Sequence, residues 1–319
     1  MDDLIPLGLG PVMLRPDLLA EGLTDRDIGV LVRNGALHRL RHGAYAIGPD
    51  WRNADADARH ALLARAVVRQ ARTDVVLSHV SALPEYGAPT WNLPLDVVHL
   101  TRKDRRAGRK ERGVRQHQGV LLDGDVVTRN GVKLTSPDRT PLDITTLAGV
   151  EPSLVVMNYF LHEGLTTPER LQQRYDRMRK DPFTLRTDLV LRLADGRIES
   201  VGESRTVFLC WRHSVPAPVP QWRVYDDAGG LVARLDFAWP ELGLWMEFDG
   251  REKYLKYLEE GETVVDAVLR EKQRESRIAE ITDWRCIRIT WADLEQPERT
   301  AARIIAFLQR ASRATTVTS

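Results

Sequence analysis

Long apolar runs, cysteines and net charge are what this 319-residue sequence has little of. No apolar run approaches the roughly 20 residues that a membrane-spanning helix needs, so we expect no membrane partner. The two cysteines, Cys210 and Cys286, lie in apolar segments without zinc-ligand spacing, which indicates buried thiols. Because the formal net charge is only +1, affinity for a nucleic acid would have to come from local patches.

Targeting signals and repeats are lacking as well. Asp2 and Asp3 stand where a secretory signal would be basic, so we expect a cytoplasmic protein. What is present, 43% hydrophobic and 29% charged residues, is typical of globular domains. The chain is too long for one compact core, and we expect two or three domains followed by a disordered tail at 313–319.

Residues 234–250 predict two short strands joined by a tight turn at 240–243. Three carboxylates, Asp236, Glu247 and Asp249, interrupt this apolar segment. Side chains alternate along a strand, so Glu247 and Asp249 share a face, and hairpin pairing would bring Asp236 to it. Clustered carboxylates repel one another and are costly to desolvate. The pattern therefore predicts a divalent cation such as Mg²⁺ or Mn²⁺.

The order Glu203, Asp236 and Glu247-Phe248-Asp249 resembles the PD-(D/E)XK nuclease superfamily, most closely its branch related to very-short-patch repair endonucleases. The resemblance covers roughly residues 195–312. In that superfamily a helix donates a glutamate, a strand an aspartate, and the next strand carries E-x-K. The resemblance implies that Glu203, with Glu199 as a substitute, and the strand residues Asp236 and Glu247 hold Mg²⁺ or Mn²⁺ for phosphodiester hydrolysis.

Asp249 stands where the superfamily carries its lysine. By the resemblance, Asp249 would be a further metal ligand or an acid/base group, and Lys253 would reach back to stabilise the transition state, with Lys272 a weaker substitute. The alternative interpretation is that these carboxylates mark no metal site, because acidic residues at strand ends are common.

Residues 11–48 predict a helix, a turn, a second helix capped by Thr24, and a basic hairpin turning at Gly43. This pattern is similar to the N-terminal domain of AbiEi-type antitoxins, whose second helix enters the major groove while the wing contacts phosphate. The resemblance implies DNA contacts by Arg26, Arg33, His38, Arg39, Arg41 and His42. The alternative is a surface helix and hairpin that only docks on its neighbour.

The region between these parts predicts a middle α/β domain. Its basic run 102–117 is either a phosphate-binding loop or a solvated hairpin tip, with Arg105, Arg106 and Arg109 as candidate contacts. Residues 134–143 resemble a segment of AbiEi-like chains, and we expect an ion pair between Arg139 and Asp143 at helical spacing. Ser78 and His79 lack a third residue at a spacing typical of a catalytic triad. We therefore expect Ser78 to cap a helix and His79 to have a packing role.

We therefore expect an α/β (α+β) multidomain protein: a winged helix-turn-helix at 1–50, an AbiEi-like domain at 51–194 and a nuclease-like domain at 195–312. Lys272, Gln273 and Arg277, on a late charged helix, are candidate phosphate contacts, unless that helix is only covered by its own ion pairs. The expected function is metal-dependent DNA cleavage in defence or repair. The rivals are a DNA-binding regulator with a decayed nuclease fold and an antitoxin that sequesters a toxin.

Overall fold

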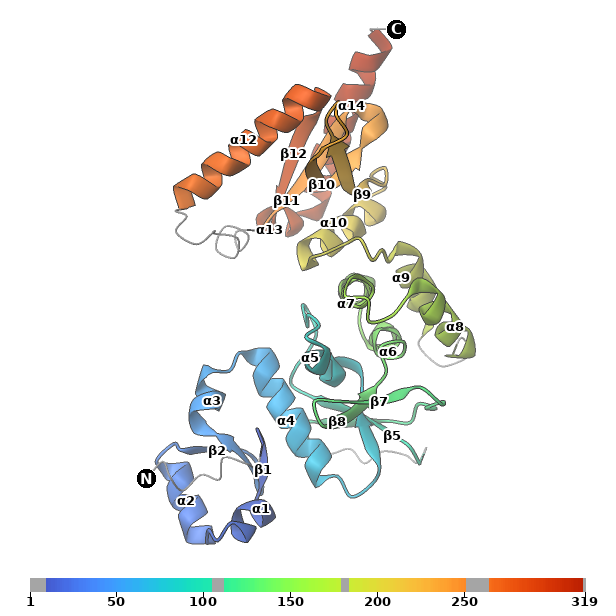
Figure 1. Ribbon diagram of the computed structural model, residues 1–319. Coiled ribbons are helices and arrows are strands. Elements are labelled where there is room, and N and C mark those ends of the chain that lie inside the picture. The colour runs from blue at the N-terminus through green and yellow to red at the C-terminus, as the bar shows by residue number, and fades with distance from the viewer. Residues whose placement is uncertain (1–9, 105–111, 179–183, 251–263, 318–319) are drawn as a thin grey trace. The chain divides into compact units, whose positions relative to one another are not determined.

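The structure is a computed structural model that describes residues 10–104, 112–178, 184–250 and 264–317 (Figure 1). The chain divides into two compact units. The first comprises residues 1–160 and 164–191, and the second comprises 161–163 and 192–319. Both are mixed α/β, which confirms the expected fold class. The finer assignment of three domains stays a prediction.

The first unit opens with a small sheet of order β1-β3-β2 and two helices: β1 (Met13–Leu14), α1 (Arg15–Ala20), α2 (Asp25–Arg33), β2 (Leu37–Arg41) and β3 (Ala44–Ile47). Thr24 caps α2 as expected, because its Oγ1 accepts the Asp27 N–H and the Asp27 carboxylate accepts the Thr24 N–H. The hairpin turns at Gly43, where φ is +70°. Local signals thus place these elements correctly.

The rest of the first unit surrounds a five-stranded mixed sheet of order β6-β5-β4-β8-β7. Its strands are β4 (Val75–Leu77), β5 (Val98–Arg102), β6 (Val114–His117), β7 (Val126–Arg129) and β8 (Val132–Thr135). The helices are α3 (Gly48–Asn53), α4 (Ala56–Gln70), η2 (His79–Ala82), α5 (Leu83–Tyr86), α6 (Thr140–Leu147), α7 (Val150–His162), α8 (Pro168–Met178), η3 (Thr184–Arg186) and α9 (Thr187–Leu193). Leu77, Leu100, Leu134 and Phe160 are fully buried in its core.

The second unit is a four-stranded sheet of order β12-β11-β10-β9 with helices on its faces (Figure 1). In chain order it contains α10 (Val201–Arg212), β9 (Val219–Tyr225), β10 (Leu231–Trp239), η4 (Pro240–Leu242), β11 (Leu244–Asp249), α12 (Val264–Thr282), β12 (Arg285–Thr290), α13 (Trp291–Leu294) and α14 (Pro297–Val317). β9, β10 and β11 pair antiparallel, whereas β11 and β12 pair parallel. α12 lies between those two parallel strands in the chain, as a parallel connection requires.

Two apolar clusters cover opposite faces of this sheet. Met246 and Phe248 pack with residues of α14, whereas Trp245 packs with Ile278 of α12. A Cβ at Gly202 of α10 would lie 2.0 Å from Phe248 Cε1, so the glycine permits close packing of this helix on β11. Glu203 follows at the next position of α10.

Two expectations about local structure need correction. Ser78 precedes a 3₁₀ helix but makes no side-chain cap, because its Oγ contacts His79 and Thr101 instead. α14 continues to Val317, so the first residues of the segment expected to be a disordered tail are helical. Within the described residues, no helix has the length and apolar character that crossing a membrane requires.

Replacing Gly48 with Ala should destabilise the first unit. The added Cβ would lie 1.9 Å from the Gly35 carbonyl oxygen, a backbone atom that cannot turn away. We expect a loss of about 1–3 kcal/mol in the free energy of unfolding, measured by chemical denaturation. Gly29→Ala is the matched control, because its Cβ would meet only the end of the Arg33 side chain, at 3.2 Å, inside helix α2. It should be neutral or stabilising. Equal losses in both variants would contradict the packing argument.

Candidate functional site

The carboxylate strands of the second unit are paired as the sequence predicts. β10 and β11 are antiparallel, with Phe237 opposite Met246. The pairing runs from Trp239 opposite Leu244 to Phe237 opposite Met246, and Asp236 and Glu247 are the next residues along their strands. Asp236 is 8% exposed and Glu247 is 7% exposed. Two carboxylates on adjacent strands therefore have little access to water, and their charges need compensation.

That compensation comes from the backbone and from α12. The Phe248 N–H donates to Asp236 Oδ2 at 2.9 Å. Arg274 of α12 places its Nη2 3.1 Å from Glu247 Oε1, and its guanidinium lies 5.8 Å from the ring centroid of Trp245. Helix α12 thus supplies a cation to the face that carries the carboxylates.

A second group of charges connects the end of β11 with β12 and α12. Asp249 Oδ2 is 3.6 Å from Arg288 Nη1, and Arg288 also pairs with Glu275 of α12 at 2.5 Å. Asp249 is less buried than Asp236 and Glu247. The alternative was that ion pairs within α12, of Arg270 and Arg274 with Glu271 and Glu275, cover this helix. Arg274 and Glu275 pair with residues of the neighbouring strands, and the side chain of Glu271 lies outside the described residues.

Glu203 is buried at the start of α10, where it forms a capping arrangement with Ser200. Ser200 Oγ donates to Glu203 Oε1, and Gln221 Nε2 of β9 and the Glu199 N–H donate to Oε2. The structure places Asp236 and Glu247 on adjacent, paired strands. In the part of the chain that it describes, Glu203 is not in a group of three acidic ligands with oxygens within 4.8 Å of one another. Glu199, the substitute, pairs with Arg234.

Some of the predicted phosphate contacts are exposed in the structure, and others lie outside the described residues. Lys272, Gln273 and Arg277 are exposed on α12. Lys253 and the basic-loop residues Arg105, Arg106 and Arg109 lie outside the described residues. In the first unit, Arg26, Arg33, Arg39 and His42 are exposed, whereas Arg41 is half-buried. His38 stacks on Trp51 with ring centroids 4.3 Å apart, so this side chain faces its own unit.

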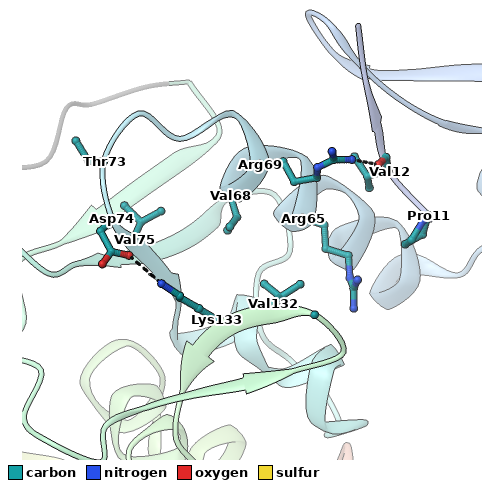
Figure 2. Close-up of a pocket in the computed structure, with 11 residues that line it drawn as sticks. Pro11, Val12, Arg65, Val68, Arg69, Thr73, Asp74, Val75, Val132 and Lys133 are labelled. Atoms are coloured by element: carbon teal, nitrogen blue, oxygen red, sulfur yellow. Dashed lines mark hydrogen bonds and ion pairs between the residues drawn. The ribbon is translucent and has the colours of Figure 1, made fainter. Parts of the chain in front are cut away.

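One pocket of about 450 Å³ lies in the first unit between α4, the segment before β1 and the β7–β8 hairpin (Figure 2). Three basic side chains line it, and each has an acidic partner. Arg65 pairs with Glu85, Arg69 with Asp17 and Lys133 with Asp74. Figure 2 shows Lys133 directed at Asp74 and Arg69 at the Val12 carbonyl. Paired cations do not favour the binding of an anionic ligand here.

A buried polar network occupies the other side of the first unit. Arg139 pairs with Asp143, as expected from their helical spacing. Arg174 of α8 makes two hydrogen bonds to Asp125, at 2.6 and 2.7 Å, and these two residues are 8% and 3% exposed at their side chains. This second pair joins residues 49 positions apart, and no local pattern predicts it.

The sequence interpretation also missed a cluster of histidines. Among the described residues, His79, His99 and His117 form a group whose ligand nitrogens lie within 4.8 Å of one another. Desolvation lowers the pKa of His79 well below its ordinary value, that of His99 to about 4 and that of His117 to about 2, so all three rings are neutral. Only the order of β4, β5 and β6 in the sheet brings them together.

Comparison with known proteins finds two relatives that span nearly the whole chain. An uncharacterized protein of Mycobacterium tuberculosis strain CDC 1551 / Oshkosh is 27% identical over 291 residues, which cover 91% of this chain and 98% of that protein. An uncharacterized protein of strain H37Rv matches to the same extent. No family model matches the chain. The matches span both units, so the two units occur together in other proteins. The names of these relatives say nothing about an activity.

Removing Arg174 should destabilise the first unit more than removing Arg170, which lies one helical turn away. Arg174→Met leaves Asp125 buried beside Arg139 alone, at 3.5 Å, and we expect a loss of about 3 kcal/mol in the free energy of unfolding. Arg170→Met removes a pair with Asp138 whose arginine is 54% exposed, and should cost less than about 1 kcal/mol. Chemical denaturation of both variants compares them directly, and equal losses would contradict a buried ion pair.

Proposed function

We propose that this protein binds DNA and cleaves it by metal-dependent phosphodiester hydrolysis in its second unit. The observation that carries the proposal is that two buried carboxylates, Asp236 and Glu247, lie on adjacent paired strands of one sheet. Buried charges of like sign are costly to desolvate and repel one another. Their placement is costly for a fold that uses them only as structure, and a divalent cation removes the cost.

The order of elements supports the same proposal. A helix with a buried glutamate is followed by three antiparallel strands, a charged helix and a strand parallel to the third. The glutamate helix, the strand of Asp236 and the strand of Glu247 come in the order that the resemblance to PD-(D/E)XK nucleases implies. The donor set also fits, because carboxylate oxygens are the ligands that Mg²⁺ and Mn²⁺ prefer. Asp236 and Glu247 would hold the ion together with Glu203. Asp249 would be a further ligand or an acid/base group.

When bound, Mg²⁺ lowers the pKa of a coordinated water and neutralises charge on the phosphate. The chain's own residues supply the rest. The Phe248 N–H fixes the orientation of the Asp236 carboxylate. Arg274, only 28% exposed, carries a positive charge on the face where the related nucleases place their lysine. Lys272, Gln273 and Arg277, exposed on the same helix, are the proposed contacts to the DNA backbone.

DNA contact by the first unit rests on its element order, two helices followed by a hairpin that pairs with β1. This order supports the proposed winged helix and its resemblance to AbiEi-type antitoxins. Arg26 and Arg33 on α2, with Arg39, Arg41 and His42 on the hairpin, are the proposed contacts. Asp25, at the start of α2, pairs with Arg15 at 2.6 Å, which reduces the repulsion that its charge would exert on phosphate.

A second candidate function is that of a DNA-binding regulator that does not cleave. Two observations favour it: Asp249 stands in place of the lysine, and Arg274 already compensates Glu247. In this case the second unit would use a decayed nuclease fold for binding, and an antitoxin that sequesters a partner toxin is a further form of the same idea.

Asp236→Asn should abolish Mg²⁺ or Mn²⁺ binding and cleavage of plasmid DNA. The amide oxygen still accepts the Phe248 N–H, so the fold is preserved while the ligand charge is lost. Titration calorimetry measures the metal, and gel electrophoresis measures the cleavage. Glu241→Gln, an exposed glutamate on η4 in the turn between the same strands, is the matched control and should leave both unchanged.

Each outcome of this experiment separates the two functions. Metal binding and cleavage that are lost together in Asp236→Asn establish the nuclease. A wild-type protein that binds DNA but neither metal ion leaves the regulator as the function. Cleavage that persists in Asp236→Asn would place the activity elsewhere.

Arg39→Ala should weaken DNA binding and reduce its dependence on salt. Loss of one phosphate contact lowers the slope of log K against log salt concentration by about 0.9. Fluorescence anisotropy with a labelled duplex at several salt concentrations measures that slope. Arg72→Ala, an exposed arginine outside the helix and hairpin, is the control. An unchanged slope for Arg39→Ala, or an equal change for Arg72→Ala, would remove the hairpin from the interface.

A further inference from the structure

The histidine cluster of the first unit lies across three neighbouring strands. His99 belongs to β5 and His117 to β6, while His79 lies two residues after the end of β4. His99 Nδ1 is 2.9 Å from His117 Nε2. The rings of His79 and His117 stack with centroids 3.8 Å apart, and those of His79 and His99 lie 5.7 Å apart. Three imidazoles therefore meet at one point of the sheet.

These distances are close to those of a bound transition metal. Two imidazole nitrogens at roughly 2.0–2.1 Å from a tetrahedral Zn²⁺ lie roughly 3.3–3.4 Å apart. The His99–His117 separation is somewhat shorter, and the ligand atoms of all three residues are within 4.8 Å of one another. Small rotations of the rings are enough to reach coordination geometry.

The surroundings keep the rings in the form that binds metal. His79 and His99 are 5% and 4% exposed, while His117 is half-buried and leaves a route for an ion. Neutral imidazole is the ligand, and a protein interior that disfavours imidazolium does not require a proton to leave before the metal binds. The cluster thus differs from surface histidines, where protons compete with metal near neutral pH.

His79 is held in an unusual conformation. Its φ is +52°, which a residue other than glycine seldom adopts. The His79 Nδ1 is 2.9 Å from Ser78 Oγ, which in turn accepts the Thr101 hydroxyl at 2.9 Å. This chain of contacts orients the ring and leaves Nε2 as its ligand atom. Metal-binding histidines are commonly oriented in this way through their other nitrogen.

An acidic group lies next to the cluster. Asp143 is 1% exposed, and its Oδ2 has no hydrogen-bond partner among the described residues, although Oδ1 pairs with Arg139. Its charge raises the pKa of His117 against the larger effect of burial, so the two side chains are electrostatically coupled. A buried carboxylate oxygen without a partner is costly. Burial raises the pKa of Asp143, and a cation bound at the histidines would stabilise the charged form of this carboxylate.

We propose that His79, His99 and His117 form a binding site for one divalent transition-metal ion, of which Zn²⁺ is the probe. Three nitrogen ligands select Zn²⁺, Co²⁺, Ni²⁺ or Cu²⁺ over Mg²⁺ and Mn²⁺. Three protein ligands leave a fourth position for water or another small ligand. The ion would join β4, β5 and β6, and so fasten β6, the strand at the end of the sheet order, to its neighbours.

The test uses the full chain, stripped of metal with a chelator and dialysed. After Zn²⁺ is added back, we expect the wild type to retain one ion per chain through gel filtration, measured by elemental analysis, and its Tm to rise with Zn²⁺. Co²⁺ should give visible absorption bands of a low-coordinate site. His117→Gln, the least buried substitution, should lose the stoichiometric ion, the bands and the Tm shift. His162→Gln, an exposed histidine on α7, is the matched control and should bind as the wild type does.

Zinc binding by the three histidines can also be tested on the wild type alone. Imidazole ¹⁵N resonances of three histidines should shift with one equivalent of Zn²⁺, which covers the case of a variant that fails to fold. Asp236→Asn should keep its zinc, so this site and the proposed Mg²⁺ site fail or succeed separately. A wild type that retains no zinc, or a folded His117→Gln that binds it with unchanged affinity, would overturn the proposal.

Discussion

Charge buried far from water is the constraint on which both units depend. Each unit places acidic and basic side chains inside the fold and neutralises them with partners distant in the sequence: Asp125 with Arg174 in the first, Glu247 with Arg274 in the second. A buried charge that loses its partner is strongly destabilising. The helices α8 and α12 must therefore dock in one register on their sheets, since a shift by one residue would separate each pair.

The same constraint gives the two units different chemical characters. In the second unit, oxygen ligands and arginines share a face of the sheet, an arrangement suited to phosphate and to hard cations. In the first unit, neutral imidazoles meet beside a buried carboxylate, which suits softer ions. The protein thus combines two chemically distinct candidate sites in separately folded parts, and neither depends on the composition of the other.

Much of the fold follows from local sequence signals. Thr24 marks the start of α2 because its side chain caps the helix, and Gly43 marks the hairpin because its φ is positive. The antiparallel pairing of β10 with β11 follows from strand periodicity plus the short turn between them. The histidine cluster does not follow, because β4 and β6 are brought to opposite sides of β5 only by the sheet order. The ion pair of Arg274 with Glu247 does not follow from helical spacing either, because only tertiary packing brings α12 to β11.

The tryptophans are distributed unevenly, so the two units contribute unequally to the intrinsic fluorescence. Of the eight tryptophans, only Trp51 and Trp91 belong to the first unit. In the second unit Trp245 lies on the carboxylate face, with Arg274 near its ring, and Trp222 lies 6.2 Å from Trp284. Intrinsic fluorescence therefore reports chiefly on the second unit, and its emission is sensitive to any ligand that displaces Arg274. The protein carries its own spectroscopic probe beside the carboxylates.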